Sequence, residues 1–231
     1  MRKPAIYLVT ALFLLAFTQQ LVGQETIFNV PSGDVLDKSK VYGEFDFAYR
    51  WDNSSGSYVP RVVVGVGHRI EIGVNLNGIA SPGPSETTLS PTIKWKAYDG
   101  TANGWALVVG DDVFIPMQNR SYTSGNYLYG ELTKTLKAST RFTFGAYDFT
   151  PNAVSSRNEA GGQFGVEQPI GKRVTLAADW YTGKQALGYL TPGLVIKLSL
   201  RATLYTAYEI GNSGASSGNR LLLCEFGWNF N

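Results

Sequence analysis

The sequence predicts an all-β fold, a transmembrane antiparallel β-barrel of about twelve strands, on three observations. First, apolar and polar residues alternate with a period of two through most of the chain, which is the pattern of strands with two unlike faces. Second, only 16% of the 231 residues are charged, while 13% are aromatic and 26 are glycine; a soluble domain has roughly 25% charged residues. Third, no apolar stretch long enough for a membrane-spanning helix follows the N-terminal region.

The N-terminus has the layout of a secretory signal peptide. Arg2 and Lys3 precede an apolar run over Ala5–Phe17, which is short for a transmembrane helix of about 20 residues. We expect cleavage after Gly23, so that residues 1–23 are the signal peptide. An uncleaved membrane anchor is the alternative.

Charge and cysteine content exclude several function classes. Two of the 20 Lys and Arg residues lie in the expected signal peptide, so the remaining 18 balance the 18 Asp and Glu residues. This balance gives no basis for nucleic-acid binding. Cys224 is the only cysteine, so the chain cannot form an internal disulfide. The sequence contains no metal-ligand spacing and no cofactor motif, and we expect neither a metal nor a cofactor.

Twelve alternating segments can be placed along residues 41–231, each near the 9–11 residues that a tilted strand needs to cross a bilayer. They run over 41–51, 59–67, 70–79, 89–98, 104–113, 125–135, 139–149, 161–168, 173–182, 188–197, 200–210 and 220–230. Short connections such as 67–69 alternate with longer polar ones such as 111–124, as periplasmic turns and external loops do. Ten strands is an alternative count, and a soluble secreted sandwich is an alternative fold.

The last predicted strand, Arg220–Phe230, resembles the C-terminal signal of bacterial outer-membrane proteins, an alternating strand that ends in an aromatic residue. It departs from that signal in Asn231, which follows the aromatic. The resemblance is to the class of outer-membrane, porin-like β-barrels and indicates no family within it. It implies recognition of this strand by the barrel assembly machinery, contact with outer-membrane lipid and a Gram-negative type envelope, with both termini in the periplasm.

Residues 24–40 precede the predicted barrel, which occupies residues 41–231. We expect them to form a periplasmic N-terminal segment; entry into the lumen as a plug is the alternative. Ser32 or Asp34 is a candidate N-cap for a short helix over Val35–Lys38.

The alternation predicts which charged residues face the lumen, because Arg or Lys on the lipid face near the midplane costs about 2–4 kcal/mol. The predicted lumen-lining residues are Glu44, Asp46, Arg50, Arg61, Glu71, Lys94, Lys96, Glu131, Arg141, Glu167, Asp179, Arg201, Glu209 and Glu225. Strand closure should bring Glu225 beside Glu44 and Asp46. Lys94 and Lys96 should form a basic wall away from that seam.

Aromatic residues near the strand ends are expected to form girdles at the two membrane interfaces. The expected outer girdle consists of Trp51, Tyr58, Tyr147, Phe149, Trp180, Tyr181 and Tyr208. The expected periplasmic girdle consists of Tyr42, Tyr98, Trp105, Trp228 and Phe230.

The function that the sequence favours is a narrow passive channel for small polar or charged solutes, which pore width and lumen charge would screen. A non-conducting structural or adhesive barrel, acting through its external loops, is the first alternative. A membrane-embedded lipid hydrolase is the second. Such hydrolases use a Ser–His pair, but His68, the only histidine, falls in a predicted periplasmic turn. We therefore expect no enzymatic activity and no catalytic residue.

Overall fold

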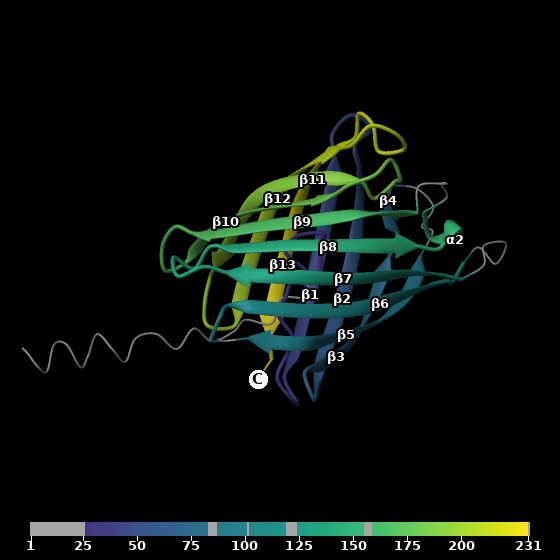
Figure 1. Ribbon diagram of the computed structural model, residues 1–231. Coiled ribbons are helices and arrows are strands. Elements are labelled where there is room, and N and C mark those ends of the chain that lie inside the picture. The colour runs from purple at the N-terminus through teal and green to yellow at the C-terminus, as the bar shows by residue number, and fades with distance from the viewer. Residues whose placement is uncertain (1–25, 83–86, 101, 119–123, 155–158, 231) are drawn as a thin grey trace, which may run out of the picture.

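The computed structural model describes residues 26–82, 87–100, 102–118, 124–154 and 159–230. The predicted signal peptide lies outside these residues. The described chain forms one closed antiparallel barrel of twelve strands, with one additional short strand, β4 (Figure 1). No helix in the described ranges is long and apolar enough to cross a membrane.

The elements follow the predicted segments closely. The strands are β1 Val41–Arg50, β2 Ser55–Gly67, β3 Ile70–Asn77, β4 Ile79–Ser81, β5 Thr88–Gly100, β6 Trp105–Pro116, β7 Gly125–Thr135, β8 Arg141–Phe149, β9 Ala160–Pro169, β10 Val174–Tyr181, β11 Tyr189–Lys197, β12 Ala202–Gly211 and β13 Arg220–Asn229. A single turn of helix, α2 Pro151–Val154, follows β8.

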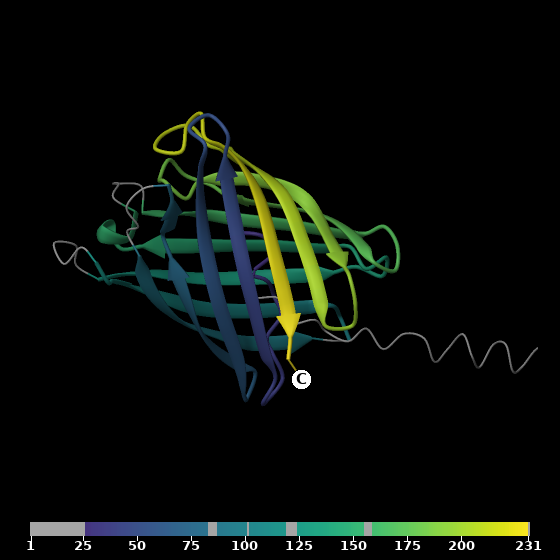
Figure 2. The same ribbon diagram turned by 180° about the vertical axis from the view of Figure 1, so that it is seen from behind.

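The barrel closes because β1 pairs with both β2 and the last strand, β13. Figure 2 shows β13, in yellow, beside β1, in purple. In this register Phe45 lies opposite Phe226, and Asp46 lies opposite Glu225. The all-β barrel and its twelve strands are confirmed, so the ten-strand count and the two-sheet sandwich are wrong.

Most predicted strand boundaries lie within three residues of the observed ones, and two of the differences have a clear cause. The segment 70–79 is divided at Gly78, whose φ of 75° is a conformation that residues with a side chain rarely adopt. Beyond this glycine, β4 pairs only with β2, whereas β3 pairs with β2 and β5. Strand β2 begins at Ser55 rather than at 59, because its first residues already pair with β1 and β4.

The two faces of the barrel differ in polarity. Each of the twelve barrel strands exposes a large apolar side chain, in strand order Phe45, Val62, Ile72, Ile93, Val109, Leu128, Phe144, Phe164, Leu176, Leu190, Ile210 and Phe226. The inner face instead buries polar groups, among them Glu131, Thr143 and Gln163. A barrel in water has the reverse arrangement, because burial of apolar surface drives folding there.

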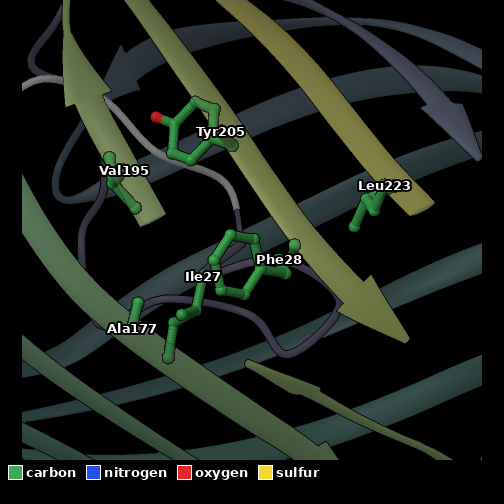
Figure 3. Packing of buried hydrophobic residues seen from close by; sticks show 7 residues of the cluster. Ile27, Phe28, Ala177, Val195, Tyr205 and Leu223 are labelled. Atoms are coloured by element: carbon green, nitrogen blue, oxygen red, sulfur yellow. The ribbon is translucent and has the colours of Figure 1, made fainter. Parts of the chain in front are cut away.

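The described part of the N-terminal segment lies inside the barrel, as the plug alternative expects. Ile27 and Phe28 are at most 1% exposed and pack among Ala177, Val195 and Leu223 of the inner wall (Figure 3). No helix forms over 35–38; residues 35–37 have no regular secondary structure, and a turn at 38–39 leads into β1. We refer to residues 26–36 as the plug.

Candidate functional site

The plug is fastened at the middle of the lumen by one carboxylate. The backbone N–H groups of Phe28, Asn29 and Val30 donate hydrogen bonds of 2.9, 2.7 and 2.8 Å to Oδ2 of Asp179 on β10. The side-chain amide of Asn29 also donates to Thr191 Oγ1 and Glu209 Oε1, at 3.0 and 2.8 Å. Consecutive N–H groups that converge on a carboxylate make a concave anion site, and here the barrel wall itself supplies the anion.

The second half of the plug is held by charged side chains near the short-turn end of the barrel. The backbone N–H of Leu36 donates to Glu71 Oε2 at 2.7 Å, and Arg141 Nη1 donates to Asp34 Oδ2 at 2.7 Å. Burial raises the pKa of the Asp34 carboxyl, but the positive charge of Arg141, with smaller contributions from two lysines, outweighs burial and holds that pKa below its ordinary value. Asp34 is therefore an ionised partner of the barrel wall at neutral pH.

Glycines in the barrel wall leave room for the plug. At Gly65 a Cβ atom would overlap the backbone carbonyl oxygens of Leu36 and Asp37, and at Gly165 it would overlap Ile27 Cδ1. A close backbone approach of this kind explains glycine within a strand. The wall is thus shaped to the plug as well as hydrogen-bonded to it.

An acidic cluster lies at the seam where the barrel closes. The carboxylate oxygens of Glu44, Asp46 and Glu225 come within 4.8 Å of one another. Arg61 on β2 forms an ion pair with Asp46 and lies 3.4 Å from Glu44. The predicted convergence of Glu225 with the Glu44–Asp46 pair is confirmed by this geometry. One guanidinium therefore faces three carboxylates.

A partly open cavity of about 580 Å³ lies between the plug and the long-loop end of the barrel. Phe28, Asn29 and Pro31 of the plug line its inner end, and Gly78 and Leu187 line it beyond the strands. A cavity of this volume is within the range of small-molecule sites. On the other side of the plug, side chains such as Tyr42 and Thr143 are buried, each 1% exposed.

Aromatic rings form one wall of the cavity. The Tyr127 ring stacks between Tyr129 and Phe149, with ring-centroid distances of 4.9 and 4.7 Å. The Tyr127 hydroxyl donates to Gln163 Oε1 at 2.6 Å and accepts from the hydroxyl of Tyr181 at 2.5 Å. These rings are held in place by one another and by hydrogen bonds. We call Tyr127, Tyr129 and Phe149 the aromatic shelf.

The structure distributes the predicted lumen-lining residues unevenly. Those buried or partly buried on the inner face of the strands are Glu44, Asp46, Arg61, Glu71, Lys94, Lys96, Glu131, Arg141, Glu167, Asp179, Glu209 and Glu225. Arg50 lies at a rim, 4.0 Å from Asp52, and Arg201 is exposed in the turn before β12. The expected basic wall does not exist, because Lys94 lies 2.8 Å from Glu71 on the adjacent strand and Lys96 lies 3.8 Å from Asp99.

The girdle prediction was wrong for four aromatic residues. Tyr42, Tyr147, Phe149 and Tyr181 are buried, at most 6% exposed, and point into the lumen. Strand parity would have found them, because alternate residues of a strand share a face. Each is separated by an even number of positions from a charged residue that we assigned to the lumen on the same strand. The shelf residues Tyr127 and Tyr129 likewise share the parity of Glu131.

The single histidine lies far from the cavity in the fold. His68 is exposed in the two-residue turn between β2 and β3, with a φ of 54°. It lies at the short-turn end of the barrel, whereas the cavity lies in the long-loop half. This position gives no support to the hydrolase hypothesis.

No protein-family model matches the chain, and no curated protein matches it. The function proposed below therefore rests on the geometry of the lumen.

Proposed function

We propose that this chain is an outer-membrane β-barrel whose lumen is closed at rest by its own N-terminal plug, so that it is not an open diffusion channel. The exposed apolar side chains on the outer face support the membrane location, since all twelve barrel strands contribute at least one. Soluble monomers rarely expose contiguous apolar patches larger than a few hundred Å². Export through the inner membrane, periplasmic termini and recognition of β13 by the assembly machinery belong to the same proposal.

The observation that carries the closed lumen is the attachment of Phe28, Asn29 and Val30 to Asp179. Hydrogen bonds to a buried carboxylate are stronger than neutral ones, and these three hold the plug at the inner end of the cavity. A passive channel needs a continuous aqueous path past this point. The geometry therefore favours the non-conducting alternative over the narrow channel.

Planar-bilayer recordings of the refolded protein test this function. We expect the wild type to be electrically silent and a variant that lacks residues 26–36 to open in discrete steps. Asp179→Leu, which removes the acceptor of three N–H groups, should open intermittently. Asp148→Asn, on the outer face of β8, is the matched control and should stay silent.

Folding is verified separately by the heat-dependent migration of each variant in detergent gels. If the deletion variant does not fold, Asp179→Leu alone decides the question. Step conductance in the wild type equal to that of the variants would show that the plug does not close the lumen.

A further inference from the structure

The cavity beyond the plug has the features of a ligand site, and we propose that it binds a small organic cation, an amine or quaternary ammonium group attached to an apolar body. The inference rests on the closed lumen proposed above, since Phe28 and Asn29 of the plug line its inner end. It adds a ligand class that the closed barrel alone does not imply.

The charge of the lining favours a cation. Four carboxylates line the cavity, those of Asp46, Asp112, Glu209 and Glu225. Among the described lining residues Arg61 is the one cationic side chain, and it is already engaged with Asp46 and with Glu44. A low-dielectric cavity lined by one sign of charge concentrates ligands of the opposite sign.

Two buried polar side chains of the lining are candidates to contact a ligand. Glu225 is 2% exposed, and its carboxylate lies within 4.8 Å of those of Glu44 and Asp46. Asn75 is 6% exposed, and its Oδ1 atom accepts no hydrogen bond from any described residue. Both line the cavity, and both lie near the closing seam, because Asn75 is opposite Arg61 in the β2–β3 register. A buried acceptor without a donor is unfavourable, and the N–H groups of a bound ammonium would donate to Asn75 Oδ1 and pair with the Glu225 carboxylate.

The aromatic shelf lies on the opposite side of the barrel. Glu225 and Asp46 belong to β13 and β1, whereas the shelf belongs to β7 and β8, half-way around the ring of twelve strands. Phe114 of β6 lines the cavity beside the shelf. Aromatic faces bind apolar groups and cations alike. A ligand with a cationic head toward the seam and an apolar body toward the shelf would use both walls.

A bare metal ion fits the same residues less well. Glu44, Asp46 and Glu225 have ligand-atom spacings that a metal could use, but the Arg61 guanidinium already contacts Glu44 and Asp46. A metal ion would therefore meet a fixed positive charge at the site. An organic cation instead reaches Glu225 from the cavity and leaves the Arg61 ion pairs in place.

Calorimetric titration of the refolded protein in neutral-detergent micelles tests the inference with three probes of similar shape, 2-phenylethylamine, 2-phenylethanol and 3-phenylpropionate. Protein-free micelles give the blank for partitioning. We expect the amine to bind about tenfold more tightly than the alcohol, which corresponds to one charge-assisted hydrogen bond. The carboxylate should bind most weakly.

Two variants separate the two walls. Glu225→Gln should remove the preference for the amine over the alcohol. Phe114→Leu should lower the affinity for the amine and for the alcohol alike. Asp148→Asn should change neither. Equal binding of the three probes, tighter binding of the carboxylate, absence of binding, or an amine preference that survives Glu225→Gln would each overturn the inference.

Binding in micelles is independent of conductance in a bilayer, so the two proposals can fail separately. A wild type that conducts but binds the amine would overturn only the closed lumen. A silent wild type that binds no probe would overturn only the ligand class.

Discussion

Two regions of the lumen, the short-turn half and the closing seam, differ in how their buried charges are compensated. In the short-turn half, buried charges have partners: Arg141 lies between Asp34 and Glu167, at 2.7 and 3.4 Å, and Lys94 lies 2.8 Å from Glu71. At the closing seam, Glu225 is buried beside two other carboxylates with a single guanidinium nearby. Paired charges specify the position of the plug. At the closing seam the carboxylates outnumber the cationic side chains, so their negative charge is incompletely compensated when no cation is bound.

This contrast indicates where the protein is stabilised and where it is adapted to a task. Removal of one partner from a buried ion pair is costly, because it leaves an uncompensated charge. Removal of one carboxylate from a crowded acidic cluster relieves repulsion instead. A substitution that removes a charge in the short-turn half should therefore lower stability. Removal of a carboxylate at the closing seam should weaken ligand binding without lowering stability.

The largest expected effect is that of Arg141→Gln. This substitution leaves the Asp34 and Glu167 carboxylates without their cationic partner and should lower the free energy of unfolding by about 3–5 kcal/mol. Glu225→Gln, at the closing seam, should leave that free energy unchanged or raise it. Guanidinium-induced unfolding in detergent micelles measures both. An equal loss of stability in the two variants would contradict the contrast between the two regions.

A smaller effect is expected from Gly65→Ala, because the added Cβ overlaps the backbone of Leu36 and Asp37. Overpacking of this kind should cost about 2–3 kcal/mol and displace the plug. Gly130→Ala is the matched strand control, since its Cβ would meet nothing closer than 3.7 Å. Unfolding midpoints and bilayer recordings of the two variants should differ; identical behaviour would show that the plug adjusts freely to the wall.

The smallest expected effect is the pH dependence that Asp34 contributes. Its pKa in the folded state lies below the ordinary value of 3.8, so its stabilisation is present at neutral pH and is lost as the pH falls through the folded-state pKa. The difference in unfolding free energy between wild type and Asp34→Asn should therefore shrink between neutral pH and about pH 3. A difference that stays constant, or that grows in acid, would show that the Asp34–Arg141 pair does not hold the plug.

Much of the wall could be read from the sequence, because the signal for each strand is local. Ten consecutive residues are enough to show two unlike faces. Pairing of the first strand with the last then predicts that Glu44, Asp46 and Glu225 lie together. The parity of Glu131 also identifies the faces of Tyr127 and Tyr129, which we had not assigned to the lumen. Distance from a strand end does not distinguish the two faces of a strand, whereas parity does.

The interior could not be predicted in the same way. Phe28 and Asp179 are separated by 151 positions, and residues 26–36 carry no periodic pattern that distinguishes a plug from a segment outside the barrel. Lys94 was assigned to a basic wall because its partner, Glu71, is revealed only by the register between two strands. Pairing across strands depends on register and on the three-dimensional closure of the sheet.

By itself, the sequence determined an all-β barrel of about twelve strands with an apolar and a polar face, because alternation is a property of neighbouring residues. Only the tertiary structure decided that the barrel holds its own N-terminal segment and that one half of its lumen retains a cavity. The reason is physical: burial and hydrogen bonding inside a closed sheet join residues from distant strands, and no local pattern records which of them meet.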